Sequence, residues 1–362
     1  MKRKAVFGLV LMLSLTGVLM PFMIQTVKGQ KVWYVYGGGG KDFTTIQAAI
    51  NAASDGDGIY VFNGTYTESV EANKTVRLVG ENPTNTIIQI PATPNPTYGV
   101  YITANNSLVS SFTIIESPPD PGQITYGIEL ISVEGCIVTN NTIQVDYCGI
   151  VAGWAKKATI MHNNLINCGN VGVMLKDSNE SIVAANNISQ CAAGIDFEDG
   201  SMGNTFTQNN ITSCTIYGVA AYSSGNLIYH NNIIDNALQV DIFPGDVNTW
   251  NNDTAPESGG NYWSNYTGVD NDHDGLGDTP HVLDGLNQDN YPLINAVSTD
   301  LLTADINGDR RIDMKDIAAL INAYNGAPFG PRWNPYTDLN ADLRTNVRDI
   351  AMTVMNFNKH YP

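Results

Sequence analysis

The chain has 362 residues, with 18 Lys and Arg residues against 35 Asp and Glu residues, so its formal charge is −17. A chain this acidic repels the phosphates of nucleic acids and of anionic lipids, and we exclude both as partners. Hydrophobic residues make up 43% of the chain, which argues against disorder. The length allows two or three domains, or one elongated repeat domain with an appendage.

Residues 1–29 have the features of an export signal. Three basic residues precede an apolar run from Ala5 to about Ile24, and the small residues Val27 and Gly29 fit the −3 and −1 sites of a signal peptidase. An uncleaved anchor is the alternative, because about 20 apolar residues span a bilayer. No second apolar segment of that length follows, so we predict a secreted or cell-surface protein without membrane contact beyond the signal.

A repeat of 22 or 23 residues runs through the middle of the chain. Asn-Asn pairs mark it, and a Gly followed by a short stretch of alternating apolar residues recurs in step with them. A period in the low twenties is typical of a solenoid, and the alternation predicts strands rather than helices. The pairs are Asn140-Asn141, Asn163-Asn164, Asn186-Asn187, Asn209-Asn210 and Asn231-Asn232, and the Gly-led stretches begin at Gly99, Gly127, Gly149, Gly172, Gly194 and Gly218.

The composition of each repeat favours an all-β solenoid. Leucine-rich repeats share this period, but Leu is sparse here, and Asn, Gly and Thr disfavour the helical half that those repeats need. We therefore predict a parallel β-helix with coils about 4.8 Å apart. We expect the paired Asn residues to adopt the left-handed conformation at a turn and to form an amide ladder along the axis. The N-x-S/T sequons at Asn187 and Asn210 are interpreted as products of this ladder.

The two ends of the solenoid need covers. At the front, residues 42–53 are predicted to form a helix, since Thr44 and Gln47 have the spacing of a capping box and one face is apolar. A Pro-rich insertion near Pro118 lengthens one coil and should project beside the outer face. The apolar face consists of Ile46, Ala49, Ile50 and Ala53.

Several motifs resemble known β-helix families. The segment Val35-Tyr36-Gly37-Gly38-Gly39-Gly40 and the helix after it are similar to the opening of pectate-lyase-like right-handed β-helix proteins. The Asn-Asn coils and Gly260-Asn261-Tyr262-Trp263-Ser264 resemble the secreted NosD-type family, which is common in archaea. The resemblance covers roughly residues 32–295. It implies a right-handed parallel β-helix in a carbohydrate-associated surface protein. The name of the NosD-type family derives from copper-related accessory proteins. Right-handed β-helices of this kind host lyases, hydrolases and inert binders.

Two regions have the spacing of calcium loops. Alternate carboxylates of a Gly-containing loop converge on one point, which suits a hard cation, although a solvated acidic loop is the alternative in the first region. In the second region the loop occurs twice, 33 residues apart, and each copy runs into an apolar-periodic helix. The predicted Ca²⁺ ligands are Asp270, Asp272, Asp274 and Asp278 in the first region; Asp305, Asn307, Asp309, Arg311, Asp313 and Asp316 in the first copy; and Asp338, Asn340, Asp342, Arg344, Asn346 and Asp349 in the second, with Arg311 and Arg344 supplying carbonyl oxygens.

This duplicated, EF-hand-like segment resembles a type I dockerin, and the resemblance implies a calcium-dependent module with a cohesin-like protein partner. Arg310 and Leu343 stand where dockerins have Gly, so we expect lowered calcium affinity there. A terminal module that binds calcium but no partner is the alternative. The predicted organisation is a signal peptide (1–29), a β-helix domain (30–295), a linker (296–302) and a dockerin-like domain (303–362). The positions that face the partner in dockerins hold Met314-Lys315 and Val347-Arg348.

The outward face of the Gly-led strands is the candidate binding surface. Lys176 and Glu198 occupy equivalent places on adjacent coils, and Asp196 lies on the same face, so the three should lie within about 5–7 Å of one another. Carboxylates beside a Lys suit acid–base chemistry on a uronide or glycoside, and aromatic rings stack on sugars. A solvated ion pair, sugar binding without chemistry, and catalysis by a polysaccharide lyase or glycoside hydrolase remain open. The catalytic candidates are Lys176, Asp196 and Glu198, and the substrate-binding candidates are Tyr101, Glu129, Trp154 and Tyr222.

Cys168, Cys191 and Cys214 occupy one position of three consecutive coils. We interpret them as an inward ladder of small apolar residues, with a disulfide or a soft-metal site as alternatives. His162 and His230 lie three coils apart, about 14 Å, and do not share a metal. We therefore predict Ca²⁺ rather than copper as the cofactor, and a polysaccharide or cell-surface glycan together with a cohesin-like domain as partners.

Overall fold

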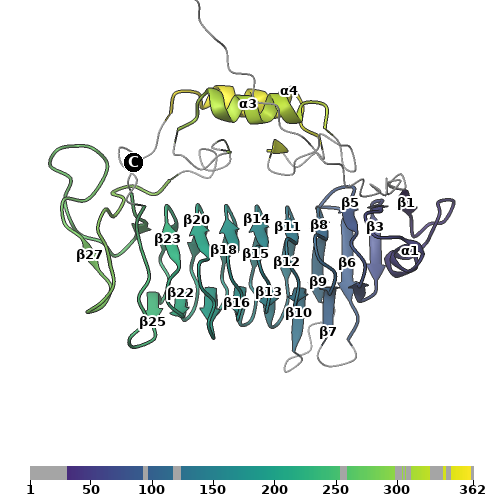
Figure 1. The fold of residues 1–362 in the computed structure, drawn as a ribbon, viewed down its shortest axis with the longest axis horizontal. Helices are drawn as coiled ribbons and strands as arrows, with labels where there is room; N and C mark the ends of the chain where they lie inside the picture. The colour runs from purple at the N-terminus through teal and green to yellow at the C-terminus, as the bar shows by residue number, and fades with distance from the viewer. Residues whose placement is uncertain are drawn as a thin grey trace, which may run out of the picture. The chain divides into compact units, whose positions relative to one another are not determined.

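Three parallel β-sheets run side by side in the computed structural model of the protein (Figure 1). The predictions for the signal peptide and for the Pro-rich insertion, and most of the predicted linker, lie outside the residues that the structure describes. The described residues are 31–92, 97–116, 124–252, 259–297, 304, 306, 311–326, 337–339 and 344–359.

Successive strands of the chain go to different sheets, and each strand pairs with the strand one coil later. The first sheet contains β1 (Val32–Val35), β2 (Gly58–Val61), β5 (Arg77–Gly80), β8 (Leu108–Ser110), β11 (Ile137–Thr139), β14 (Thr159–Met161), β17 (Ile182–Ala184), β20 (Thr205–Thr207) and β23 (Leu227–Tyr229). The second, Gly-led sheet contains β4 (Val70–Ala72), β7 (Thr97–Ile102), β10 (Thr125–Ile131), β13 (Cys148–Gly153), β16 (Val171–Lys176), β19 (Ala193–Glu198), β22 (Tyr217–Tyr222) and β25 (Leu238–Ile242). The third sheet contains β3 (Gly64–Thr67), β6 (Thr86–Ile90), β9 (Thr113–Glu116), β12 (Thr142–Gln144), β15 (Asn164–Ile166), β18 (Asn187–Ser189), β21 (Asn210–Thr212), β24 (Asn232–Ile234) and β26 (Tyr262–Trp263). This connectivity is that of a parallel β-helix, so the predicted fold class is confirmed.

The strand register confirms the predicted period. Asn164 pairs with Asn187, and Asn187 pairs with Asn210. The first pair is an exception, because Thr142 rather than Asn141 pairs with Asn164. In each Gly-led strand the first and third residues after the Gly are buried: Val100, Ile102, Ile128, Leu130, Ile150, Ala152, Val173, Leu175, Ile195, Phe197, Val219 and Ala221.

A ladder of buried Asn side chains runs along the turn between the first and third sheets. The side-chain amide and the backbone N–H of each Asn donate to the side-chain oxygen of the Asn one coil later; for Asn163 and Asn186 both distances are 3.0 Å. All of these bonds point the same way, so they polarise one another along the axis. The ladder consists of Asn141, Asn163, Asn186, Asn209, Asn231 and Asn261.

The left-handed residue of this turn is not the ladder Asn, and our prediction was wrong on this point. The ladder Asn is selected instead by its buried amide, which satisfies backbone groups that the turn leaves unpaired. The Asn186 amide, for example, donates to the Ile160 carbonyl at 2.9 Å. The left-handed residues precede the ladder Asn in each coil and are Asn140 (φ 59°), His162 (53°), Ala185 (52°), Gln208 (59°) and His230 (54°).

A second buried ladder, which the sequence analysis did not find, follows the turn between the second and first sheets. It begins at a Ser and continues through Asn side chains with the same direction of donation. The members from Ser181 to Asn248 recur at the coil period, and Asn287, 39 residues after Asn248, continues the stack. Its members are Ser181, Asn204, Asn226, Asn248 and Asn287.

Both ladders end on carboxylates of one segment of the chain. Asn261 donates its backbone N–H to Asp289 at 2.6 Å, and Asn287 donates its amide to Asp284 at 3.0 Å. Asp289 is fully buried and also accepts the indole N–H of Trp263 at 2.9 Å. Burial raises the pKa of Asp289 to about 6, although these hydrogen bonds act in the opposite direction. The antiparallel pair β27 (His281–Val282) and β28 (Gln288–Asp289) holds this segment, which therefore closes the C-terminal end of both ladders.

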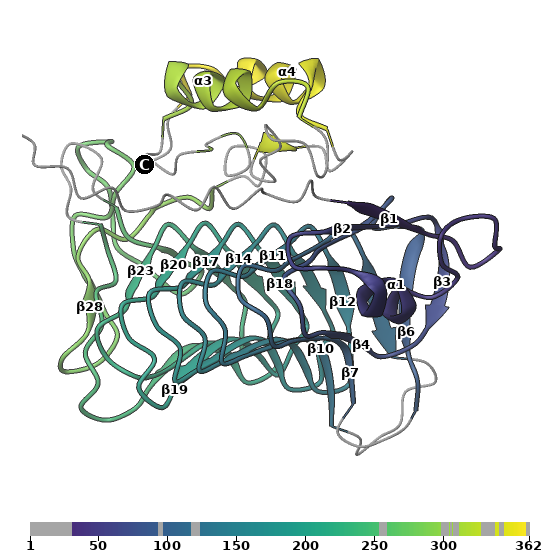
Figure 2. The same cartoon turned by 45° about the vertical axis from the view of Figure 1, so that its right-hand side comes forward.

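Helix α1 (Ile46–Ala52) lies at the N-terminal end of the β-helix (Figure 2). Three residues of its predicted apolar face are fully buried in the core. Its N-cap is Thr45 rather than the predicted Thr44. The carboxylate of Glu68 accepts the N–H groups of Ile46 and Gln47 at 2.8 and 3.0 Å. The first turn is therefore capped by Thr45, which accepts the Ala48 N–H at 3.4 Å, and by Glu68 from the next coil, and not by the capping box that the sequence predicted.

Two further helices, α3 (Met314–Ala323) and α4 (Val347–Met355), belong to the predicted calcium module. Their N-caps are Asp313 and Asn346, which are 33 residues apart, and each helix begins with a capping box. None of the helices in the described part of the chain is long and apolar enough to cross a membrane.

Candidate functional site

The alternation of β19 places the predicted catalytic candidates on the outer face of the second sheet. Ile195 and Phe197 are fully buried, so Asp196 and Glu198 point outward. Lys176, at the end of β16, pairs in register with Glu198. The structure thus brings Lys176, Asp196 and Glu198 together on one face.

An ion-pair network holds Lys176. Its ammonium lies 2.9 Å from Asp199 Oδ2 and 3.1 Å from Glu198 Oε1, and these hydrogen bonds raise the pKa of Lys176 above its usual range. The Lys176 side chain is 40% exposed, so water screens both pairs and they contribute little to stability. Asp199 was not among the predicted site residues. Its position directly after the strand was the only signal for it in the sequence.

Asp196 has a different environment from the network beside it. It is 8% exposed, and its Oδ1 is buried without a hydrogen-bond partner. Its register neighbours are Met174 and Ala220, whose side chains offer no hydrogen-bond donor. Burial, followed by the nearby charge of Glu198, raises the pKa of Asp196 to about 7. A carboxyl group that is largely protonated just below neutral pH therefore lies beside an exposed ion-pair network.

Two of the four predicted substrate-binding residues lie next to this network. Tyr222 pairs in register with Glu198, and its hydroxyl donates to Asp241 at 2.5 Å. Burial and then this bond raise the pKa of Tyr222. Trp154 follows β13, donates its backbone N–H to the Lys176 carbonyl at 2.9 Å, and is 57% exposed.

The other two predicted substrate-binding residues form a separate pair further along the sheet. Tyr101 and Glu129 are register partners on β7 and β10. Glu129 lies on the third strand away from β19, which is about 14 Å from Asp196. Burial raises the pKa of Glu129. The site predicted from the sequence is therefore split into two groups on one face.

Part of this outer face carries an apolar layer that the sequence analysis missed. The outward positions mix polar and apolar residues, and that mixture conceals the layer in the sequence. Four small or medium side chains are buried beneath four larger ones that are only partly buried. The buried residues are Cys148, Val151, Val171 and Ala193, and the larger residues over them are Tyr126, Tyr147, Met174 and Tyr217.

The predicted loop near the end of the β-helix domain brings three of its four carboxylates together. Oxygen atoms of Asp270, Asp272 and Asp278 all lie within 4.8 Å of one another, and within the described ranges they are the one group of three His, Cys, Asp or Glu residues this close. Asp274 is not in the group; its N–H donates to Asp270 at 3.2 Å, and its carboxylate accepts the N–H of Leu276 at 2.8 Å. Oxygen donors of this kind suit Ca²⁺.

The two halves of the helical segment use the same contacts. Asp316 accepts the N–H groups of Ile306 and Asp313 at 2.8 and 2.9 Å. Asp349, 33 residues later, accepts those of Leu339 and Asn346 at 2.8 and 2.7 Å, and both carboxylates are fully buried. The described ligand candidates also include Arg311, Asp338 and Arg344, whereas Asp305, Asn307, Asp309, Asn340 and Asp342 lie outside the described residues.

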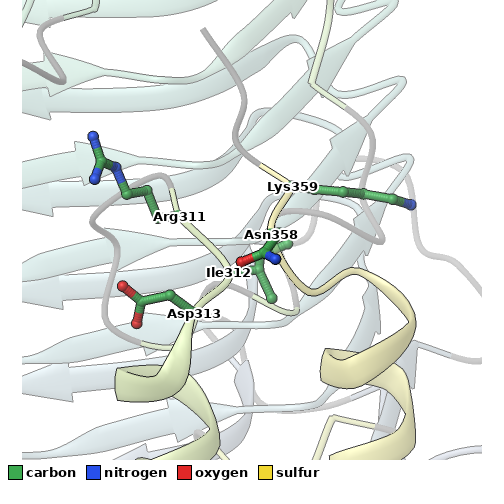
Figure 3. Close-up of a pocket in the computed structure, with 5 residues that line it drawn as sticks. All are labelled: Arg311, Ile312, Asp313, Asn358 and Lys359. Atoms are coloured by element: carbon green, nitrogen blue, oxygen red, sulfur yellow. The ribbon is translucent and has the colours of Figure 1, made fainter.

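Each loop also pairs with the chain that follows the opposite helix. Ile312 exchanges backbone hydrogen bonds with Asn358 and Lys359 at 2.9 and 3.0 Å, and Thr345 does the same with Asn325 and Gly326 at 2.8 and 3.1 Å. Figure 3 shows the first of these places, where a hollow lies beside the loop. The side chains of Arg311 and Lys359 project away from each other there, so the two cations do not converge on one ligand.

Residues 50–268 match the family model described as "Periplasmic copper-binding protein (NosD)", which is more than half of the chain. The chain belongs to the NosD family. Residues 303–358 of this NosD-family chain match the model of the dockerin type I domain. The predicted resemblances to the NosD family and to type I dockerins are thereby confirmed.

A cell surface glycoprotein of Methanothermus fervidus is 36% identical over 116 residues, which are 32% of this chain and 17% of that protein. The chain therefore spans less than a fifth of that relative. Similar solved structures include the catalytic domain of a GH87 alpha-1,3-glucanase in complex with tetrasaccharides (18% identity, TM-score 0.48, 57% of this chain and 40% of that chain). Another is pectin methylesterase from carrot (14% identity, TM-score 0.44, 66% and 88%). Likeness at this level says nothing about activity.

The described residues of this NosD-family chain do not fit a copper centre. Cys168, Cys191 and Cys214 are buried free thiols in the core, in agreement with the predicted apolar ladder. Burial raises the pKa of the Cys214 thiol to about 12, whereas a metal binds the thiolate. The close group of three carboxylates in the Asp270 loop supplies hard oxygen ligands, which suit Ca²⁺ or Mg²⁺ rather than copper. We assign no role to copper.

Proposed function

We propose that this NosD-family chain is a surface- or scaffold-attached protein outside the cell, whose β-helix binds a polysaccharide. The observation that carries the attachment is the matched pair of buried carboxylates, Asp316 and Asp349, in a segment that matches the dockerin type I domain. The cell surface glycoprotein relative supports a location at the surface. We propose the same organisation as before: signal peptide, β-helix domain, linker and dockerin-like domain.

Calcium is the proposed cofactor of the C-terminal module and of the loop from Asp270 to Asp278. A buried carboxylate is costly unless hydrogen bonds or a cation compensate its charge. Asp316 and Asp349 each hold one end of their loop to the start of a helix, so a bound cation would join the same oxygen atoms to the remaining loop ligands. In the β-helix, a cation would neutralise the three carboxylates that lie together.

A protein partner is proposed for the exposed apolar positions of the module. Met314 is 61% exposed and Val347, at the equivalent position, is 64% exposed. Ile321 and Val354 are also equivalent and are 57% and 50% exposed. Paired apolar residues at the surface favour a protein contact, such as a cohesin-like domain, over a module that binds nothing.

The polysaccharide is proposed to lie on the outer face of the second sheet, across Trp154 and Tyr222. Trp154 is exposed and Tyr222 is half-buried. Aromatic side chains at a surface stack against sugar rings, and the carboxyl groups nearby hydrogen-bond to sugar hydroxyls. The alternative of a solvated ion pair does not explain why Asp196 is kept buried on an outward face beside that pair.

The test is the retention of the full chain on a panel of immobilised polysaccharides, with calcium present throughout. We expect at least one polysaccharide to retain the wild type, and we expect Trp154→Ala and Glu198→Ala to weaken retention by about tenfold each, as lost stacking and lost charged hydrogen bonds of about 1.4 kcal/mol would do. If the wild type is retained and neither variant changes retention, the ligand binds elsewhere. If the wild type is retained by none, the β-helix is a structural spacer.

A second candidate function is glycoside hydrolysis or polysaccharide lysis on the same face. The raised pKa of Asp196, about 7, favours this candidate, because a general acid works best when its pKa lies near the working pH. The same panel reports it, since hydrolysis yields new reducing ends and lysis yields unsaturated sugars that absorb ultraviolet light. Retention without either product identifies a binding protein.

A further inference from the structure

We propose that the outer face around Asp196 selects an uncharged polysaccharide, and that Asp196 donates a hydrogen bond from its protonated carboxyl group to a sugar oxygen. This inference rests on the proposed function and names the ligand class of the same face.

The position of Asp196 favours a donor rather than an anion. Its Oδ1 is buried without a partner, so only Oδ2 is left to contact a ligand. An unpartnered carbonyl oxygen of a neutral acid costs far less than an unpartnered oxygen of a carboxylate. The proton therefore belongs on Oδ2, where it points a donor toward the surface.

The groups that face Asp196 come from four strands and one turn. Glu198 follows it on β19 and Asp199 lies in the next turn, and their charges raise its pKa in addition to burial, whereas Lys176 on β16 lowers it. Cys148 on β13 is a buried thiol whose own pKa is raised to about 12, so it stays neutral. On β22 burial raises the pKa of the Tyr222 hydroxyl, so this group also stays neutral. Asp196 thus titrates near pH 7 on a face where the Cys148 thiol and the Tyr222 hydroxyl stay neutral.

The charge of the same face excludes an acidic ligand. Lys176 is paired with two carboxylates, Glu198 and Asp199, so this network carries a net charge of −1. Glu129 and Asp241 add carboxyl groups to the face, and the chain as a whole carries −17. A uronate would lack a free cation there and would meet like charges. An uncharged sugar is not repelled by these charges. It can accept a hydrogen bond from Asp196 and donate hydrogen bonds to the carboxylates nearby.

The experiment measures the affinity of the full chain for soluble polysaccharides at pH 6 and pH 8, at constant ionic strength and calcium. The uncharged probes are galactomannan, xyloglucan and a β-glucan, and the acidic probes are polygalacturonate and alginate. If only the protonated form binds, the dissociation constant for an uncharged probe rises about tenfold from pH 6 to pH 8, because the competent fraction falls from about 0.9 to about 0.1 around a pKa of 7.

Three variants separate this role from a structural one. Asp196→Asn supplies an amide donor at every pH, so it should bind as the wild type does at pH 6 and should show no change at pH 8. Asp196→Ala should weaken binding at pH 6 by about tenfold, the loss of one hydrogen bond of about 1.4 kcal/mol. Glu180→Gln is the control, since Glu180 pairs with Lys156 outside the sheet face, and it should keep the wild-type pH profile.

The outcomes are decisive in each direction. Three results would overturn this inference without contradicting the proposed function. They are stronger binding at pH 8, an Asp196→Asn variant with the wild-type pH profile, and a preference for the acidic probes. Retention of none of the five probes would remove the proposed polysaccharide binding itself. Circular dichroism of each variant shows whether a loss of binding reflects a loss of fold.

Discussion

Replacing Asn186 with Ala is expected to lower the thermal transition of the β-helix by about 6–10 °C, because it opens the middle of the buried ladder. The substitution removes four hydrogen bonds, two that Asn186 accepts from Asn163 and two that its amide donates to Ile160 and Asn209. Each buried group left without a partner costs about 1–3 kcal/mol, so the total is about 3–5 kcal/mol, and a chain of this size shifts by about 2 °C per kcal/mol.

The adjacent residue supplies a matched control. Asn187 also hydrogen-bonds to Asn residues one coil away, at 2.8 Å to Asn164, but its side chain lies on the exposed outer face. Water replaces the lost bonds there, so Asn187→Ala should shift the transition by less than about 2 °C. The measurement is the loss of the far-ultraviolet circular dichroism signal on heating. Equal shifts for the two variants would contradict the role assigned to the buried ladder.

Removal of calcium is expected to unfold α3 and α4 while the three sheets stay folded. Without the cation, the buried carboxylates of Asp316 and Asp349 keep only their backbone hydrogen bonds, and the acidic loops around them repel one another. Apolar packing and amide hydrogen bonds, rather than metal ligands, form the core and the two ladders of the β-helix. Hydrogen exchange of the full chain, with calcium or with a chelator, should show at least about a hundredfold loss of protection in α3 and α4, as expected when a module folds only with its metal.

The two loops offer a control within the same experiment. Asp316→Asn and Asp349→Asn should each weaken calcium binding to their own loop, and the double variant should exchange in calcium as the wild type does in chelator. Amides of β15 and β18, in the middle of the β-helix, should keep their protection throughout. Simultaneous loss of protection in the helices and in these strands would show that calcium holds the whole chain together, against this account.

The fold was predictable because every coil repeats the same physical requirements. A Gly-led strand must bury its first and third residues, and a ladder position must place an amide in the core, so period and residue type recur together. The stacking of the coils was therefore predictable from the spacing of Asn163, Asn186 and Asn209 in the sequence alone. The pattern does not say which of two adjacent Asn residues points inward, and the Asn140-Asn141 pair, one residue out of register, shows this limit.

The features that escaped prediction occur once or join distant residues. Asp284 and Asp289 end the two ladders through bonds to residues that differ in type and spacing from the repeat, and nothing periodic marks them. Glu68 caps α1 from the next coil, which a local capping rule cannot find. At the site, the sequence indicated that Lys176 faces Glu198. The burial of Asp196 depends on the sizes of the side chains on several neighbouring strands, which the sequence of one strand does not show.

The stacking of residues 23 apart is tested most directly by cysteine cross-linking on the outer face of the third sheet. Asn164, Asn187 and Asn210 lie in register on consecutive strands, so neighbours are about 4.8 Å apart and residues two coils apart are about 10 Å apart. A disulfide requires Cα atoms within about 7 Å. After mild oxidation, the variant with Asn164→Cys and Asn187→Cys should show the cross-linked peptide by mass spectrometry, and the variant with Asn164→Cys and Asn210→Cys should not. A cross-link in the second variant and none in the first would contradict the β-helix on which every other conclusion depends.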